Sequence, residues 1–161
     1  MADITYVPTD EGWLYVAVVL DLFSRRVVGL SMSASIDRKL ALEALGQAVR
    51  LRRPEIGLLH HSDRGSQYAS MEYQDALRQY GVQCSMSRRG NCWDNAVAES
   101  FFSTLKVELV HDEHFASRAH AEAAIREYVE RFYNVERLHS ALGYVSPIEF
   151  ELMAQVRRPA A

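Results

Sequence analysis

The chain has few cysteines and no long apolar run, and each of these shortages excludes a class of protein. Its 161 residues include only Cys84 and Cys92, whose spacing fits neither a zinc knuckle nor a redox pair. We therefore expect free thiols in a reducing cytoplasm. No apolar stretch reaches the roughly 20 residues that a membrane-spanning helix needs. The first ten residues also lack the basic start of a signal peptide, so the sequence predicts one globular domain with no membrane partner.

Basic charge is also in short supply. Eighteen lysines and arginines oppose 21 aspartates and glutamates, which gives a net charge of −3 and a pI near 6.1. DNA-binding domains usually carry a basic excess, so composition alone argues against a nucleic-acid partner. A metal-dependent nuclease escapes part of this argument because bound cations neutralise its carboxylates. We expect this chain to bind DNA weakly by itself, with most of the phosphate affinity supplied elsewhere.

The spacing of apolar residues predicts an α/β fold with a mixed sheet. Three β-rich segments joined by short turns come first and predict an antiparallel meander. The second of them is apolar on both faces, as in a central buried strand. Helical and extended patterns then alternate, which implies helices on both faces of the sheet. The expected order after the meander is a helix over about 37–51, a strand over 57–62, a helix over 70–80, a strand over 82–87, and helices over about 95–110, 117–132 and from 146 onward.

Three acidic residues stand at positions where such a sheet gathers its ligands. Asp3 lies in the first strand, Asp63 follows the fourth, and Glu99 lies on the helix after the fifth. If the first and fourth strands are neighbours, these carboxylates converge at one edge, where they could hold two cations for phosphoryl transfer. The pattern also allows a plainer interpretation, in which Asp63 caps a turn and Glu99 is a solvated helix charge. Periodicity alone does not decide between them.

Several blocks of sequence resemble one enzyme superfamily. The segments ADITYV, HHSDRGSQY and SRRGNCWDNAVAESFFSTLK are similar to the three signature blocks of Asp-Asp-Glu transposases and retroviral integrases, and 35 residues separate Asp63 from Glu99, as in that superfamily. DLFSRRVVG and YVERFYNVERLHSALGYVSPIEF resemble the second-reading-frame transposase of the insertion-sequence-three family. The resemblance covers almost the whole chain.

The resemblance implies a ribonuclease-H-like fold: a five-stranded mixed sheet with extra helices at the C-terminus. It implies that Asp3 and Asp63 bridge two metal ions, Mg²⁺ or Mn²⁺, and that Glu99 completes the shell of the second. Water would then be activated for cleavage, and the freed 3′-hydroxyl for strand transfer. The implied partners are DNA, as transposon ends and target, and further copies of the chain or of a full-length transposase.

The resemblance also predicts how the chain is divided. We expect one integrase-like domain, with the catalytic core over about 1–112 and a helical extension over 113–161. In the resembled family the first aspartate sits inside a longer strand, preceded by a domain that recognises transposon ends. Asp3 is only two residues from Met1, so we expect that upstream domain to be absent.

Basic and polar residues near the three acids are candidates for contact with DNA. Lys106 shares a helix face with Glu99 and could reach a phosphate or simply be solvated. The loop residues Arg64, Arg88 and Arg89 could grip phosphates or serve solubility. Asn95 is a further candidate, although it could also orient Glu99 or help to start the helix.

The remaining candidates have structural explanations that compete with functional ones. Trp93 could stack on a base, but we expect it to pin its loop to the core. His60 and His61 adjoin Asp63, yet Mg²⁺ and Mn²⁺ prefer oxygen ligands, so His61 is at most an outer partner of the site. We expect Asp21 to form a turn before Phe23 and Asp94 to cap a helix. A further set of interpretations remains open: a cleaving nuclease of the same fold, or a truncated transposase that only oligomerises and inhibits.

Overall fold

A five-stranded sheet forms the centre of the protein in a computed structural model that describes residues 1–87 and 95–156. The strands are ordered β3-β2-β1-β4-β5. The first three run antiparallel, whereas β4 and β5 run parallel to β1. This is the predicted mixed sheet, and the first and fourth strands are neighbours, as expected. The strands are β1 (Ala2–Thr9), β2 (Gly12–Leu20), β3 (Val27–Ser33), β4 (Leu59–Ser62) and β5 (Gln83–Met86).

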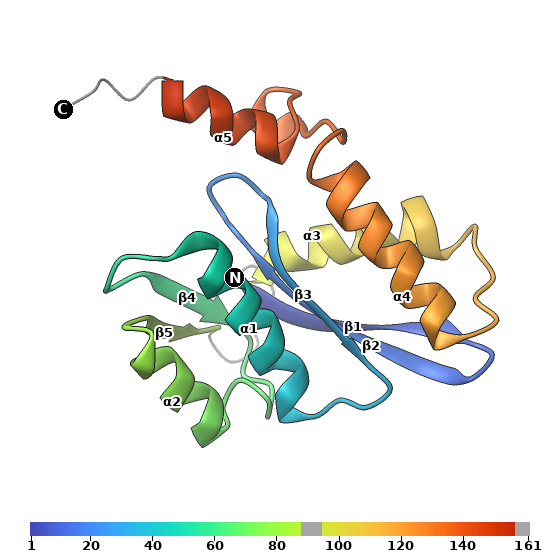
Figure 1. Ribbon diagram of the computed structural model, residues 1–161, viewed down its shortest axis with the longest axis horizontal. Helices are drawn as coiled ribbons and strands as arrows, with labels where there is room; N and C mark the ends of the chain where they lie inside the picture. The colour runs from blue at the N-terminus through green and yellow to red at the C-terminus, as the bar shows by residue number, and fades with distance from the viewer. Residues whose placement is uncertain (88–94, 157–161) are drawn as a thin grey trace.

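Helices cover both faces of the sheet. Figure 1 shows α1 and α2 on one side and α3 and α4 on the other, with α5 lying across the end of the molecule. None of the described helices is long and apolar enough to cross a membrane. The helices are α1 (Arg38–Arg52), α2 (Met71–Gln79), α3 (Ala96–Leu105), α4 (Arg118–Glu127) and α5 (Pro147–Val156), with a 3₁₀ turn η4 (Ser140–Leu142).

The central strand β2 explains why the core has two halves. Successive side chains of a strand point to opposite faces. Its even-numbered residues from Leu14 to Leu20 therefore pack against α3 and α4, whereas Ala17 and Val19 pack against α1. Full burial of a valine or leucine side chain contributes about 1.5–3 kcal/mol. The two apolar faces predicted for this strand thus hold both helix layers to one sheet.

Two segments predicted as single helices instead continue as π-helical turns. Lys106–Val110 (η2) follows α3 and Tyr128–Tyr133 (η3) follows α4. The second turn delivers Asn134 to the start of β3, where its side-chain amide accepts from the Val27 N–H at 2.9 Å and donates to the Val27 carbonyl at 3.0 Å. Asn134 therefore pairs with the strand as another strand would, and it ties the C-terminal helices to the sheet.

The junction of β1 and β4 positions the predicted acids. Ala2 pairs with Ser62 across the two parallel strands. Asp3 and Asp63 each come one residue after this pair, so they occupy neighbouring positions: Asp3 continues along β1, and Asp63 follows the end of β4. The helix α3 begins beside them, because Asn95 at its N-terminus is bonded to Asp3.

Candidate functional site

Asp3 is a half-buried carboxylate held by two hydrogen bonds. The Ile4 backbone N–H donates to Asp3 Oδ1 at 2.8 Å, and Asn95 Nδ2 donates to Asp3 Oδ2 at 2.8 Å. One bond is local, and the other comes from the first residue before α3. Hydrogen bonds to an ionised carboxylate favour its charged form. The two bonds thereby fix the direction of the side chain.

The electrostatics of Asp3 show that the three predicted acids share one neighbourhood. Burial, with the charges of Asp63 and Glu99, raises the pKa of Asp3 to about 6, although the hydrogen bonds from Ile4 and Asn95 lower it. Partly buried charges are screened less than exposed ones, so the charges of Asp63 and Glu99 act on Asp3. Asp63 after β4 and Glu99 on α3 therefore share an electrostatic neighbourhood with Asp3 on β1.

Asp63 combines the two roles that its sequence context allows. The Gly65 backbone N–H donates to Asp63 Oδ1 at 2.8 Å, which closes a tight turn after β4. A Cβ added at Gly65 would lie 2.9 Å from that same oxygen, so glycine permits the close approach. The turn role is thus present. Because it engages only one carboxylate oxygen, the other remains available for a ligand.

Glu99 is exposed in the first turn of α3. Across residues 1–87 and 95–156, no three Asp, Glu, His or Cys side chains are close enough together to enclose a metal ion. Like charges repel, so carboxylates stay apart unless a cation draws them together. The donors themselves suit Mg²⁺ or Mn²⁺, which prefer oxygen ligands.

Two buried oxygen atoms beside these acids have no hydrogen-bond partner among the described residues. They are Asn95 Oδ1 and the Tyr68 hydroxyl. Burial raises the pKa of Tyr68 well above its usual value, and Tyr73, Asp3 and Asp63 add to the rise. Buried polar atoms normally find a partner in protein, water or ligand. Both atoms therefore fit a site that takes up hydrated cations.

Tyr68 and the Asn95–Asp3 bond are features that sequence reasoning missed. Tyr68 ends the HHSDRGSQY block, but no spacing rule links it to Asp3. The two roles foreseen for Asn95 also differ from the one observed, because its side chain makes no helix-capping bond and it contacts Asp3 rather than Glu99. Its burial, with 9% of its surface exposed, favours positioning of Asp3 over contact with DNA.

The two histidines are engaged by other side chains. His60 is buried against α2 and bonds through Nε2 to the Tyr73 hydroxyl at 3.0 Å. Burial lowers its pKa to about 3, so the ring is neutral. His61 Nδ1 and Nε2 lie 2.9 Å and 3.1 Å from the hydroxyls of Ser85 and Ser87. Both nitrogens of His61 are thus occupied by β5 and the residue after it.

The predicted DNA contacts have different surroundings. Lys106 places Nζ 5.4 Å from the centre of the Tyr6 ring, a cation–π contact that aligns its stem along β1. Arg64 donates through Nε to the Ser87 carbonyl at 2.9 Å. Because Arg64 is exposed, its two terminal nitrogens can still reach a phosphate. Two further predicted DNA contacts, Arg88 and Arg89, lie outside the described residues, as do the candidates Trp93 and Asp94.

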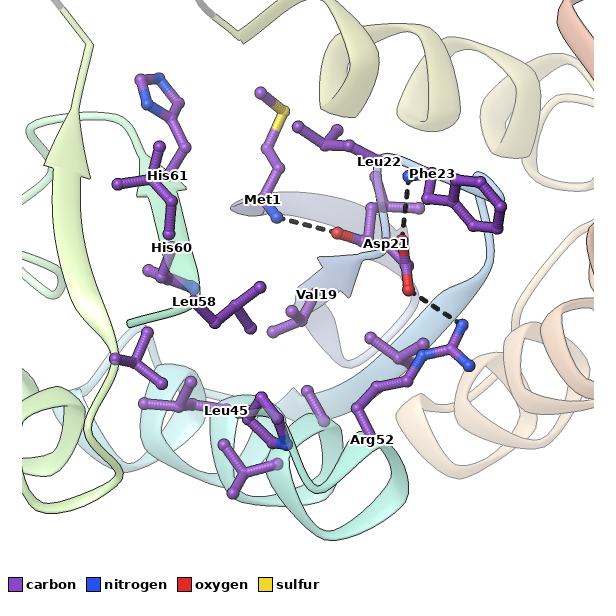
Figure 2. Close-up of a pocket in the computed structure, with 17 residues that line it drawn as sticks. Met1, Val19, Asp21, Leu22, Phe23, Leu45, Arg52, Leu58, His60 and His61 are labelled. Carbon is purple, nitrogen blue, oxygen red and sulfur yellow. Dashed lines mark hydrogen bonds and ion pairs between the residues drawn. The ribbon is translucent and has the colours of Figure 1, made fainter. Parts of the chain in front are cut away.

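A separate apolar cavity of about 320 Å³ lies between the end of β2, β4 and α1. Figure 2 shows Met1, Val19, Leu45 and Leu58 around it. The Met1 amine donates to the Leu20 carbonyl at 2.8 Å, and burial lowers the pKa of that amine to about 6 although Asp21 opposes the shift.

Asp21 also lines this cavity, and it forms the predicted turn. It accepts from the Phe23 N–H at 2.9 Å and lies 3.1 Å from Arg52 (Figure 2). Its carboxylate is therefore committed to the turn and to α1, and the turn role predicted from the sequence is confirmed.

Comparison with protein families and known sequences gives a consistent result. The integrase core domain model matches residues 1–92, and a second integrase core domain model matches residues 80–147. The chain is 52% identical over 151 residues to a transposase for insertion sequence element IS904 of Lactococcus lactis, covering 94% of this chain and 60% of the relative. It is 50% identical over 149 residues to transposase InsF for insertion sequence IS3A of Escherichia coli, covering 92% of this chain and 52% of the relative. The chain thus spans little more than half the length of these relatives.

Solved structures share the fold. The catalytic core domain of the HTLV-2 integrase, solved in complex with magnesium, superposes with a TM-score of 0.69 at 16% identity and covers 92% of both chains. A chain of the simian T-cell lymphotropic virus intasome, solved with a regulatory subunit of PP2A, gives a TM-score of 0.73 at 20% identity and covers 99% of this chain and 56% of that one. The ribonuclease-H-like integrase core fold expected from the sequence is confirmed.

Proposed function

The chain belongs to the integrase core domain family, and from that premise we propose that it is the catalytic core of a transposase that cuts and rejoins DNA with divalent cations. The observation that carries the proposal is the pairing of Ala2 with Ser62, which brings Asp3 and Asp63 together beside α3. Glu99 acts on the pKa of Asp3 from that helix. Transposase relatives at about half identity support the same activity.

The residues of the site have defined roles in this proposal. Asp3, Asp63 and Glu99 would hold the divalent cations through their carboxylates. Bound Mg²⁺ or Mn²⁺ would supply an activated oxygen nucleophile and neutralise charge that develops at phosphorus. Asn95 keeps Asp3 in orientation through the 2.8 Å bond. The magnesium in the HTLV-2 integrase core supports this choice of cation.

The chemistry is an in-line displacement carried out twice. In the first step the oxygen of water bonds to phosphorus and loses a proton, and the bond between phosphorus and the 3′ oxygen breaks. The 3′ oxygen takes up a proton, which leaves a 3′-hydroxyl on one side of the cut and a 5′-phosphate on the other. In the second step that hydroxyl attacks a phosphodiester of the target and displaces its 3′ oxygen. Positioning and charge neutralisation supply most of the catalysis in such reactions, which suits a site made of fixed carboxylates.

The proposed partners are transposon ends, target DNA and further copies of this chain or of a longer transposase. HTLV-2 integrase cores have been solved in dimeric and trimeric forms, which supports self-association. We further propose that residues 1–112 form the catalytic core and that 113–161 form a helical extension packed on it. Because the net charge is −3, most of the affinity for DNA would come from such partners.

The test is Mn²⁺-dependent nicking of supercoiled DNA by the purified chain. Glu99→Gln keeps the shape of the side chain and removes its charge, so we expect nicking to fall about 100-fold or more. Glu127→Gln, an exposed glutamate on α4, is the matched control and should nick like the parent. A second assay, joining of a pre-cut end to target DNA, separates a transposase from a nuclease of the same fold. Unchanged nicking by Glu99→Gln would refute the assignment of the site.

A further inference from the structure

A second, polar pocket of about 380 Å³ lies on the other flank of α3. Three parts of the chain that are distant in sequence build it: the turn before β3, one face of α3, and the segment after η3. The turn contributes Arg25, and the segment after η3 contributes Arg137, His139 and Ser140. The hydroxyls of Ser100 and Thr104 on α3 also line it. Residues from three of the blocks that resemble transposases thus meet in one cavity.

The pocket is basic. Its described lining includes two arginines and a histidine but no aspartate or glutamate. Arg137 is held by Glu108, which accepts from its Nε at 2.9 Å and from its Nη2 at 2.7 Å. Glu108 is fixed in turn by the Tyr128 hydroxyl at 2.6 Å. Arg25 makes no ion pair with a carboxylate of the described residues, and its positive charge acts on the neighbouring Tyr133 and His139.

The backbone at the pocket is strained at two places. Arg25 and Tyr144 adopt left-handed conformations, with φ of 62° and 61°. Among the described residues, only one other non-glycine residue, Arg53, has a positive φ. Side chains rarely tolerate this conformation, which costs about 1–3 kcal/mol and recurs at turns, helix ends and ligand-binding sites. Arg25 and Tyr144 bring two such positions to one pocket, whereas Arg53 ends α1.

His139 adds a buried atom that needs a partner. Its Nε2 is buried and has no hydrogen-bond partner within residues 1–87 and 95–156. The ring packs edge-on against Tyr133, with 4.9 Å between ring centres. Burial and the nearby Arg137 lower the pKa of His139, whereas a hydrogen bond from its ring to the Tyr133 backbone opposes them. The neutral ring thus directs its one N–H at that carbonyl, and Nε2 is an acceptor that needs a donor such as water. A buried nitrogen without a partner is costly unless a ligand or water fills the place.

We propose that this pocket binds a phosphate of the DNA backbone, through Arg25 and the hydroxyls of Ser100 and Ser140, on the strand that enters the carboxylate site. This inference rests on the proposed function. The ligand class follows from the lining. A cationic guanidinium and neutral hydroxyl donors converge, and no carboxylate of the described lining competes with the phosphate for them. Arg137 acts as a positioning residue, because Glu108 already neutralises it.

The two sites flank the exposed face of one helix. Successive residues of an α-helix are rotated by about 100°. Glu99 therefore lies on one side of the exposed Ala96 and Ser103, and Ser100 and Thr104 lie on the other. A helix is about 10–12 Å across, and phosphates on one strand repeat about every 3.4 Å along the duplex axis. A strand lying over α3 can therefore reach both sites within a few nucleotides.

Binding of a fluorescein-labelled DNA duplex by the full chain, followed by anisotropy in EDTA at low salt, tests the pocket without requiring catalysis. We expect Arg25→Gln to weaken binding about 10-fold and to lower the slope of log K against log salt by about 0.9, the value for one phosphate contact. Arg53→Gln is the matched control, because Arg53 is an exposed arginine that also has a positive φ, 44°. It should change affinity less than about two-fold.

A second variant guards against an effect of Arg25 on folding. Thr104→Glu leaves the strained turn intact and puts a negative charge into the pocket, so it should weaken binding at least as much as Arg25→Gln. Equal losses from Arg25→Gln and Arg53→Gln, or wild-type binding by both pocket variants, would overturn the proposal, as would no binding by the parent. The nicking assay with Glu99→Gln reports on the proposed function separately, so either idea can fail while the other stands.

Discussion

Asn95 Nδ2 donates to Asp3 Oδ2 at 2.8 Å, and this bond joins the start of α3 to the first strand across 92 positions of sequence. It is the only side-chain hydrogen bond in the described residues that links the helix carrying Glu99 directly to one of the other two acids. Groups that hold a metal ligand in orientation affect a metal site strongly even though they do not touch the cation. The bond therefore makes Asn95 a positioning residue of the candidate site.

Asn95→Ala should raise the Mn²⁺ concentration needed for half-maximal nicking about 10- to 100-fold. Asp3 would lose one of the two hydrogen bonds that favour its charged form and its orientation. Asn95→Asp is the informative partner variant, because it keeps the shape of the side chain but places a second carboxylate against that of Asp3. We expect it to raise the required Mn²⁺ concentration more than alanine does. Unchanged Mn²⁺ dependence in both variants would mean that the bond has no part in the site.

Gly29→Ala should disrupt the packing of β3 on α1. A Cβ at this position would lie 2.1 Å from the Ala44 carbonyl oxygen, a backbone atom that cannot move aside. Overpacking of a core commonly costs 1–3 kcal/mol, and this clash should cost about 3 kcal/mol or more, read as a fall in the free energy of urea unfolding. Gly46→Ala is the control, because its Cβ would meet only the flexible end of Arg50 at 3.2 Å and alanine favours a helix. Equal stability of the two variants would contradict the packing seen here.

Local patterns were enough to predict most of the fold. β2 packs against α1 on one face and against α3 and α4 on the other. A strand buried on both faces appears in the sequence as a nearly continuous apolar run, so it could be predicted. Asp37 and Ser117 begin helices through side-chain bonds that their residue types favour. The π-helical turns after α3 and α4 could not be predicted, because they depend on where each helix must end against the sheet.

The candidate site was predictable only in part, for a similar reason. The spacing of Asp63 and Glu99 and the surrounding blocks indicate the three acids through resemblance. Periodicity carries no information on which strands are neighbours, so the meeting of Asp3 with Asp63 needed the pairing of Ala2 with Ser62. Tyr68 and the Asn95–Asp3 bond depend on tertiary placement, as does the pocket that holds Arg25 and His139. No motif that spans a few residues reveals contacts of this kind.

Glu151 should make the protein sensitive to acid. It is joined to Arg52, accepts from Ser24 at 2.6 Å and lies 2.8 Å from Arg26. Burial alone would raise its pKa, but the hydrogen bonds from Arg52, Ser24 and Arg26 outweigh burial and lower it to about 2. Because the pKa in the fold is below the unfolded value of 4.5, the stabilisation is fully present above pH 4.5 and is lost as the pH falls toward 2.

Glu151→Gln should therefore cost roughly 2 kcal/mol of unfolding free energy at pH 7, after allowance for solvent screening. The difference from the parent should shrink steadily between pH 4.5 and pH 2, since the parent carboxylate itself becomes protonated there. The control is Glu130→Gln, whose ion pair with Arg126 at 3.6 Å is exposed and should contribute less than about 0.5 kcal/mol. A loss for Glu151→Gln that is the same at every pH would assign its effect to shape rather than charge.

Asp3→Asn should stabilise the chain in EDTA while it removes a ligand of the proposed metal site. Burial and the charges of Asp63 and Glu99 raise the pKa of Asp3 from 3.8 to about 6, so the folded protein binds this proton more tightly than the unfolded chain does. Stability consequently falls as the pH rises from about 4 to 6, and the ionised side chain stays unfavourable above that range. An amide in its place removes the repulsion, and Asn95 Oδ1, which is buried without a partner among the described residues, can accept from it after the Asn95 amide turns over.

We expect the variant to gain roughly 2 kcal/mol of unfolding free energy at pH 8 and nothing at pH 4. Thermal unfolding with added Mn²⁺ separates the two contributions: the cation should raise the Tm of the parent and leave that of Asp3→Asn almost unchanged. A variant that is less stable than the parent at pH 8 in EDTA would show that Asp3 is not strained by its neighbours, and that the three carboxylates do not share one electrostatic environment.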